Sequence, residues 1–572
     1  MYDKKPSIKV DGNLIEGWDS IIHYISEKVV NSQVVNIECY TGLNDDELIK
    51  HFQKIEHSLF IDTRTLFHSE KRLIDLTERY ITDDVLFGNI TSLSLKDYFD
   101  EEKVDEIKLK IQNYSGTTFI FGPGALLVEE GDLVIYADMP RWEIQQRMRK
   151  SSVKALGINN RSEEFSLQYK RGYFNDWEIL DKHKRDIYSK VDFWLDTVVE
   201  NEPKLIDRET FYAGINKAAT SPFRVMPFFD SAPWGGQWMK EVCDLDRSKI
   251  NYGWCFDCVP DENSLLFNVK GVDFEMPSVN LVYLKSKELL GEPVEARFGK
   301  KFPIRFDILD TMGGGNLSLQ VHPTTQYTWE NFKLPFTQDE SYYVLDAEKN
   351  SYVYLGLKKD INKEEMLSEL EIAQSGNNKP FDAEKYVNKI PAKKHSHFLI
   401  PAGTIHCSGA NSVVLEISST PNLFTFKLWD WDRLGLDGKP RPINIDRGKE
   451  VLQWDRDTDY THEQLVDKFT VIEEGNGWKE EKTGLHPNEF IETRRHTFTK
   501  EVKHYTNNSV NVFNLVDGKE IIVFSKNEEF KPFIVHYAET FIVPASVKEY
   551  YIKPHGVSEG KECITIKAYV RF

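Results

Sequence analysis

The sequence predicts a multidomain protein in which an N-terminal α/β domain precedes a mainly β module with some helices. The chain has 572 residues, which is more than a single hydrophobic core supports. Buried β-rich runs alternate with helical runs over about the first two hundred residues, a pattern typical of a parallel sheet covered by helices. From Pro222 onward the chain changes to short strands, aromatic residues and turns. We place the domains at residues 1–207, 208–485 and 486–572.

The composition excludes several classes of function. A net charge of −19 argues against a nucleic-acid partner and against an anionic membrane surface. The content of 40% hydrophobic and 13% aromatic residues is that of a globular chain. No run of about 18 apolar residues occurs, no signal-peptide core follows Met1, and the six scattered cysteines make no disulfide framework. We therefore expect a cytoplasmic protein without a membrane partner.

The first domain is expected to alternate strands with helices. A β-rich run at Val34–Cys39 leads into a helix capped by Asn44, because an asparagine followed by acidic residues is a helix-start signal. Further buried strands are expected at Thr118–Phe121 and Leu133–Asp138. The highly charged stretch Asp181–Arg208 is expected to form a linking helix or a domain boundary.

This order of elements resembles the nucleoside and uridine kinase branch of the P-loop fold. The resemblance is carried by Gly122–Gly124, Asp132–Lys150 and Gln168–Gly172. A working P-loop needs Gly-x-x-x-x-Gly-Lys-Ser/Thr, but the corresponding turn, Glu38–Asp45, has two acids and no lysine. The resemblance therefore implies a pseudokinase-like domain that lacks the Walker A lysine. Such a domain serves packing, oligomerisation or regulation and not ATP use.

One strand of the middle region, Leu317–Pro323, alternates apolar and polar residues as a half-buried strand does. In this register Ser318, Gln320 and His322 project from one face. An amide oxygen and an imidazole two residues apart are a workable pair of metal ligands. An ordinary strand with an exposed histidine is the alternative.

Two later segments carry further candidates for the same site. Glu340 begins another strand and can supply a carboxylate oxygen, although it can equally be a solvated strand end. His406 follows a Pro-Ala-Gly turn, and Val413–Ile417 is expected to be the strand that pairs beside it. His395 and His397 are rivals of His406, but they precede the turn and would face outward or toward the sheet edge. Inward-facing His and Glu on several strands are how a β-barrel holds a metal in its mouth.

The motifs LSLQVHP, ESYYVLDAE, FLIPAGTIHCSG, VVLEIS and FKLWDWDRLGLDGKPR come in the order found in type I phosphomannose isomerases, which this part of the chain resembles. PWGGQW also resembles an entry turn of that family. The resemblance covers about residues 222–572 and implies a double cupin, or jelly-roll, module. It implies one Zn²⁺ per chain and a substrate-side arginine, Arg433. The implied zinc ligands are Gln320, His322, Glu340 and His406.

The chain departs from that family where a sugar phosphate would be bound. Asp307 replaces a usual lysine, with Arg305 two residues earlier, and Gln338 replaces the lysine two residues before the ligand glutamate. Lys439-Pro440-Arg441 is kept, but Asn444 stands where a histidine often follows. The four residues that correspond to the family's metal ligands are kept, so we expect the metal site to be retained. Lysine and arginine are the residues that bind phosphate, so the loss of these lysines predicts an altered phosphate site.

The tail, residues 486–572, repeats the β texture, with strands expected near 510–513, 521–524, 541–545 and 563–566. Phe541–Ala545 echoes Phe398–Ala402, but no Gln-x-His motif precedes it and no histidine follows its turn. The tail is therefore expected to be a second, metal-free cupin domain.

By this resemblance the chain is expected to be a zinc-dependent aldose–ketose isomerase that interconverts mannose 6-phosphate and fructose 6-phosphate or a related sugar. Glu416 is the candidate for proton transfer between C1 and C2, with a packing role as its alternative. Arg433 would stabilise the enediolate oxygen or anchor the phosphate. The partner is a sugar or sugar phosphate, and a homo-oligomer through the N-terminal domain stays open. The alternative function is a non-catalytic regulatory protein that binds metal and sugar.

Overall fold

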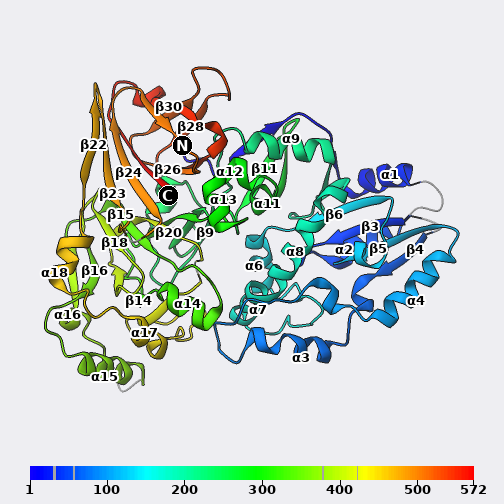
Figure 1. Ribbon diagram of the computed structural model, residues 1–572, viewed down its shortest axis with the longest axis horizontal. Coiled ribbons are helices and arrows are strands. Elements are labelled where there is room, and N and C mark those ends of the chain that lie inside the picture. The colour runs from blue at the N-terminus through cyan, green and yellow to red at the C-terminus, as the bar shows by residue number, and fades with distance from the viewer. Residues whose placement is uncertain (30–33, 56–57, 376–378, 422, 488) are drawn as a thin grey trace. The chain divides into compact units, whose positions relative to one another are not determined.

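The computed structural model describes residues 1–29, 34–55, 58–375, 379–421, 423–487 and 489–572 (Figure 1). The chain forms two compact units. The α/β unit comprises Ser7–Ala218 and Pro260–Leu284, and the β unit comprises Met1–Pro6, Ala219–Val259 and Lys285–Phe572. The expected multidomain chain with mixed α/β structure is confirmed. The division at 207/208 and 485/486 stays a prediction, and no sequence pattern indicated that Pro260–Leu284 joins the first unit.

The α/β unit is built on one large sheet whose spatial order is β2-β8-β7-β6-β3-β5-β4. The pairs among β3 to β7 are parallel, whereas β8 pairs antiparallel with β7 and with β2. The strands are β2 (Leu14–Glu16), β3 (Val34–Cys39), β4 (Ser58–Asp62), β5 (Thr117–Gly122), β6 (Leu133–Asp138), β7 (Phe193–Asp196) and β8 (Lys204–Asp207). Strands β3, β5 and β6 are buried from their second residue onward, as parallel strands covered on both faces are.

The helices of this unit follow from spacing and capping. The first helix buries Trp18, Ile21 and Ile25, three or four residues apart, and the Asn44 side chain accepts a hydrogen bond from the backbone N–H of Glu47. The helices are α1 (Trp18–Lys28), α2 (Asp45–Phe52), α3 (Glu70–Ile81), α4 (Glu101–Gln112), α5 (Ala125–Val128), α6 (Arg141–Arg149), α7 (Phe165–Arg171), α8 (Trp177–Ile187), α9 (Arg208–Ala218) and α11 (Val279–Leu284). A small sheet of β1 (Ser7–Val10), β11 (Ser264–Val269) and β12 (Val272–Pro277) completes the unit.

The expectation of a linking helix over Asp181–Arg208 is wrong beyond Ile187. There α8 ends, and β7 and β8 complete the large sheet. The charged residues that suggested a helix lie at strand ends, where Lys204 Nζ lies 3.2 Å from an oxygen of Asp196. The apolar residues between them are buried strand residues.

In the β unit, a six-stranded and a five-stranded sheet carry the first group of strands. The six-stranded sheet has the order β18-β15-β20-β13-β10-β9, and the five-stranded sheet β17-β16-β19-β14-β21. The strands are β9 (Phe228–Asp230), β10 (Trp254–Cys258), β13 (Ile304–Asp310), β14 (Leu319–Val321), β15 (Glu340–Ala347), β16 (Tyr352–Leu357), β17 (Val387–Pro391), β18 (His397–Ile400), β19 (His406–Ser408), β20 (Ser412–Ser419) and β21 (Phe426–Trp429). The alternation of Leu317–Pro323 thus does form a strand, with its apolar side chains buried.

A second group of strands forms the C-terminal sheet pair, a six-stranded sheet β22-β23-β24-β31-β26-β29 and a four-stranded sheet β25-β30-β27-β28 (Figure 1). The strands are β22 (Thr470–Gly475), β23 (Trp478–Gly484), β24 (Ile491–Phe498), β25 (Val502–Tyr505), β26 (Asn511–Asp517), β27 (Glu520–Phe524), β28 (Phe533–His536), β29 (Thr540–Val543), β30 (Glu549–Pro554) and β31 (Cys563–Val570). All of the strands expected in the tail are present.

Short helices connect the strands of the β unit. They are α10 (Trp238–Val242), α12 (Ser286–Leu290), α13 (Glu292–Phe298), α14 (Thr325–Phe332), α15 (Lys363–Gln374), α16 (Ala383–Tyr386), α17 (Ile445–Val451) and α18 (Thr458–Tyr460). Among the described residues of the whole chain, no helix has both the length and the apolar character that crossing a membrane requires.

Candidate metal centre

The candidate ligands come from both sheets of the first group. Gln320 in β14 lies opposite His406 in β19, so their side chains share one face of the five-stranded sheet. His322 follows β14 two residues after Gln320. Glu340 begins β15 in the six-stranded sheet. The fold therefore brings together residues that are up to 86 positions apart in sequence.

The polar atoms of these side chains converge in the protein interior. His322 Nε2 lies 3.2 Å from Glu340 Oε2, and His406 Nε2 lies 2.9 Å from Glu340 Oε1. His322, Glu340 and His406 are all at most 1% exposed. A metal ion needs several His, Cys, Asp or Glu side chains close together. Among the described residues, these three side chains form such a group, with one ligand atom of each within 4.8 Å of the others.

The far side of each imidazole fixes the orientation of the ring. His322 Nδ1 lies 3.1 Å from the carbonyl oxygen of Phe424, and His406 Nδ1 lies 2.9 Å from that of Thr404. A carbonyl oxygen only accepts, so Nδ1–H of each ring donates to the backbone, and Nε2 of each ring faces Glu340. Backbone carbonyls orient metal-binding histidines in the same way.

This arrangement fits a cation. Within the described part of the chain, the buried atoms His322 Nε2 and Glu340 Oε1 have no hydrogen-bond partner. Two lone pairs and a carboxylate that face each other away from water repel one another unless protons or a cation lie between them. Burial lowers the pKa of His322, but the Glu340 carboxylate, the Phe424 carbonyl and Asp339 together raise it above its usual value. Burial alone would raise the pKa of Glu340, yet the two imidazoles hold it well below its usual range.

Gln320 adds a fourth polar group. Its amide nitrogen lies 3.2 Å from His406 Nε2, and its amide oxygen accepts a hydrogen bond from the Ser318 hydroxyl at 2.9 Å. A half-turn of the amide would exchange the two ends and present the oxygen to the ion, while the Ser318 hydroxyl can accept as well as donate.

Glu416 lies beside the ligand set, but not for the reason that its sequence position suggested. The expectation that its strand pairs with the strand of His406 is wrong, because β20 pairs with β13 and β15 in the other sheet. The link to the centre is Gln338, whose amide nitrogen donates to Glu340 Oε2 at 3.0 Å and to Glu416 Oε1 at 3.2 Å. Burial raises the pKa of Glu416 well above its usual value, and the nearby carboxylates of Glu340 and Asp307 raise it further.

Arg433 is tied to its own surroundings. Its guanidinium donates to the Asn316 carbonyl oxygen at 2.6 Å and to Asp430 at 2.6 Å. Arg441 also donates to Asp430, so two arginines share one carboxylate. Arg433 thus links the segment at Asn316 to the segment at Asp430. Its role toward a substrate stays a prediction.

The rival histidines face other surroundings. His397 lies opposite Tyr343, whose side chain leaves the face of β15 opposite to that of Glu340. Burial, and then the charge of Arg495, lower the pKa of His397 to about 3. His395 Nε2 lies 3.2 Å from Asp517.

Sequence reasoning missed Lys427. This residue of β21 lies opposite Gln320, on the face that carries the ligands. Burial, and then the charge of Arg441, lower its pKa to about 8. The alternation of Phe426-Lys427-Leu428 between apolar and polar residues was the available signal.

Comparisons with known proteins match the two parts of the chain differently. A family model described as "Domain of unknown function (DUF8485)" matches residues 17–220. Mannose-6-phosphate isomerase ManA of Bacillus subtilis is 26% identical over 259 residues, which are 44% of this chain and 75% of that protein. Mannose-6-phosphate isomerase of Streptococcus mutans is 27% identical over 223 residues, 38% of this chain and 64% of that protein.

Among solved structures, the crystal structure of the mannose 6-phosphate isomerase from Bacillus subtilis aligns over 61% of this chain and all of its own, with 18% identity and a TM-score of 0.49. At that score and identity the structural likeness carries no argument about function. The sequence relatives of this chain are mannose-6-phosphate isomerases, and they support an isomerase whose N-terminal part matches a family without an assigned function.

Proposed function

We propose that the chain is a zinc-dependent aldose–ketose isomerase that interconverts mannose 6-phosphate and fructose 6-phosphate or a related sugar. The observation that carries this proposal is the convergence of two imidazoles on one buried carboxylate. Two imidazole nitrogens, a carboxylate oxygen and an amide oxygen are a donor set that Zn²⁺ accepts, with coordination positions left for substrate oxygens. Gln320, His322, Glu340 and His406 would hold the ion.

When bound, Zn²⁺ would supply Lewis-acid polarisation of the carbonyl group of the open-chain sugar. Glu416 would take the proton from C2 of the aldose and return it to C1, while the hydroxyl proton moves from O2 to O1. Its raised pKa makes Glu416 a stronger base once it is ionised. Gln338 positions Glu416 beside Glu340, and Lys427 adds a cation on the ligand face.

The test is an assay of the zinc-loaded full chain on mannose 6-phosphate, other sugar phosphates and free sugars, with fructose 6-phosphate formation followed by coupled oxidation. Turnover on mannose 6-phosphate supports the whole proposal. Turnover on another member changes the substrate but keeps the reaction type. A chain that binds zinc in a one-to-one ratio and turns over no member of the panel is not an isomerase.

That last outcome would favour a non-catalytic regulatory protein that binds metal and sugar. One observation supports this second candidate. Asp307 pairs with Arg305 at 3.0 Å and Gln338 bridges two carboxylates, so both positions that carry lysine in the resembled family are engaged in internal contacts. Sugar binding without turnover, measured by calorimetry, would distinguish it.

For the α/β unit we propose a kinase-like domain that does not use ATP. The Glu38 carboxylate accepts hydrogen bonds from the backbone N–H groups of Gly124 at 3.0 Å and Leu126 at 2.7 Å, and Asp45 pairs with Arg64. Acids thus occupy the turn where phosphates would need amides and a lysine. Calorimetric titration with Mg·ATP should give no heat of binding. A homo-oligomer through this unit is a separate expectation, which light scattering on the full chain tests.

A further inference from the structure

A cavity lies at one end of the C-terminal sheet pair, far along the sequence from the candidate metal ligands. The core between the two sheets is apolar and includes Phe513, Leu515 and Tyr550. The cavity has a volume of about 200 Å³. Side chains that line it include Trp478, Glu480, His496, His504, Lys567 and Tyr569.

Strand register places the polar side chains on the inner face. Lys567 in β31 lies opposite Arg494 in β24 and opposite the core residue Phe513 in β26. In the next row His496 lies opposite Glu480 and Thr565. From the four-stranded sheet, the His504 ring stacks on Tyr550, with ring centroids 5.3 Å apart, and lies 4.5 Å from the His496 ring.

The acid of this cluster is compensated. Glu480 Oε1 lies 3.1 Å from Arg494 Nη1 and 3.3 Å from His496 Nε2. Burial would raise the pKa of Glu480, but His496 and the neighbouring cations lower it to about 2. The carboxylate therefore has its counter-charges and needs no further cation.

Several buried polar atoms of the cluster have no partner. Within the described ranges, the buried atoms His496 Nδ1, His504 Nε2 and Thr565 Oγ1 have no hydrogen-bond partner. Lys567 is 8% exposed, and its ammonium lies over the rings of Phe513 at 6.0 Å and Tyr569 at 5.5 Å. Glu480 attracts this ammonium, but its carboxylate is already paired with Arg494 and His496, so Lys567 rests on ring faces and can accept a further anion.

From the Lys567 ammonium and the unpartnered His504 imidazole at this cavity we infer a second ligand site, in the C-terminal sheet pair, which takes a small oxyanion such as phosphate. Lys567 supplies the charge, and the His504 imidazole and the Thr565 hydroxyl supply hydrogen bonds to oxygen acceptors. The volume lies below the roughly 300–1,000 Å³ of pockets for drug-sized ligands, which favours a small occupant. Burial lowers the pKa of Lys567 to about 8, and a bound anion would offset that burial. The inference is independent of the proposed isomerase.

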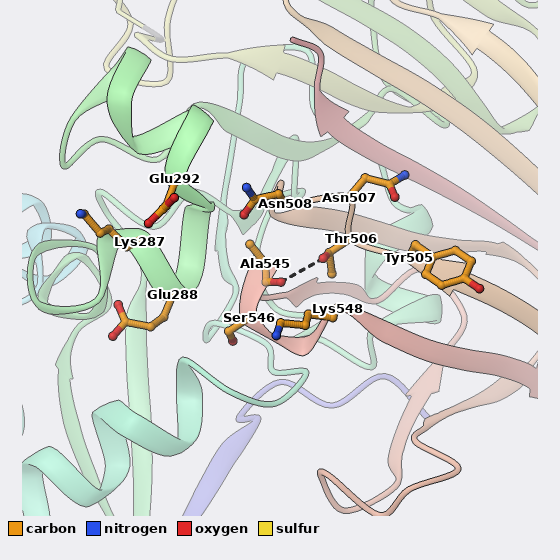
Figure 2. A pocket seen from close by; sticks show the side chains of 10 residues that line it. All are labelled: Lys287, Glu288, Glu292, Tyr505, Thr506, Asn507, Asn508, Ala545, Ser546 and Lys548. Atoms are coloured by element: carbon orange, nitrogen blue, oxygen red, sulfur yellow. Dashed lines mark hydrogen bonds between the residues drawn. The ribbon is translucent and has the colours of Figure 1, made fainter.

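A neighbouring groove of about 560 Å³ shares Tyr505, Thr506 and Asn507 with this cavity but is built differently (Figure 2). Its charged side chains Lys287 and Glu288 are exposed, and the Thr506 hydroxyl is satisfied by the Ala545 carbonyl oxygen at 2.9 Å. A lysine of this groove therefore serves as the matched control for Lys567.

The experiment is calorimetric titration of the full chain with inorganic phosphate, in a buffer free of other oxyanions. We expect binding of one phosphate that weakens at least tenfold in Lys567→Met and is unchanged in Lys287→Met. Sulfate and acetate, titrated separately, distinguish a tetrahedral oxyanion from a carboxylate. Equal binding by the wild type and Lys567→Met would place phosphate elsewhere and overturn the inference, as would absence of binding by the wild type at millimolar concentration.

A second variant and a second measurement guard against a folding defect. His504→Phe keeps the stack on Tyr550 and removes the donor, so we expect it also to weaken phosphate binding. In the wild type, phosphate should shift the imidazole nitrogen resonances of His496 and His504. Resonances of these rings that do not move on phosphate saturation would exclude them from the site.

Discussion

Lys427 and Gln320 lie opposite each other in the β14–β21 pair, so both side chains leave the same face of the five-stranded sheet. His406 is the partner of Gln320 on its other side. An ammonium, an amide and an imidazole therefore lie in one row across three strands. The ammonium is the cation that this row offers to an anionic group of a ligand bound beside the metal centre.

Replacing Lys427 by methionine should weaken substrate binding. Loss of a charge-assisted hydrogen bond is expected to raise KM for a phosphorylated sugar by about 10- to 100-fold, with a smaller effect on kcat. Steady-state kinetics on the zinc-loaded chain measure both constants. Lys427→Arg keeps the charge and should retain most of the affinity. An unchanged KM in the methionine variant would exclude Lys427 from substrate binding.

Replacing Glu416 by glutamine should impair the chemical step alone. We expect kcat to fall by about 10²- to 10⁴-fold, because the amide cannot carry a proton between carbon atoms. Because glutamine has nearly the size and shape of glutamate, zinc content and the melting temperature should stay within error. A variant with full kcat would show that Glu416 only packs beside Gln338.

Metal removal should lower stability through the site of His322 and His406. An ion present at a hundred times its dissociation constant stabilises the fold by about 2.7 kcal/mol, so a chelator should lower the melting temperature. His322→Ala and His406→Ala should each lose bound zinc and the chelator effect, as elemental analysis and thermal denaturation would show. The exposed His23→Ala is the control. Full zinc retention in both alanine variants would refute this ligand set.

Replacing Lys567 by methionine should stabilise the chain in phosphate-free buffer. The folded-state pKa is about 8 and the unfolded value about 10.4, so below pH 8 the folded state bears the whole cost of the buried charge, about 3 kcal/mol. As the pH rises from 8 to 10.4 the folded state loses its proton first, and this cost disappears. The gain in melting temperature should therefore be largest near pH 7 and shrink toward pH 10.5. A lower melting temperature for the variant at pH 7 would contradict this account.

Local pattern predicted much of the site, and non-local pairing limited the rest. The alternation around Gln320 and His322 was sufficient to place both side chains on one face, and the contact between Ser318 and Gln320 agrees with that register. Ligand chemistry made Glu340 and His406 candidates, but only the family resemblance joined them to Gln320 and His322, because no spacing rule reveals that β14 pairs with β19 or that β15 belongs to another sheet.

The errors have physical reasons as well. The turn at Gly409–Asn411 looked like a hairpin, but there the chain passes from the five-stranded to the six-stranded sheet, so Glu416 does not pair beside His406. A short turn serves either connection. In the α/β unit, buried apolar runs identified β3, β5 and β6, whereas the short strands β7 and β8 were hidden by the charges at their ends.

The candidate ligands are divided between layers: Gln320, His322 and His406 belong to the five-stranded sheet and its end, and Glu340 to the six-stranded sheet. An ion held by all four would be a cross-link between the two sheets. Its release would then loosen the two layers together, so the backbone amides of β14 and β15 should exchange their hydrogens faster in concert. Metal supply would in this way set how often these two strands open to solvent, whether or not a sugar is present.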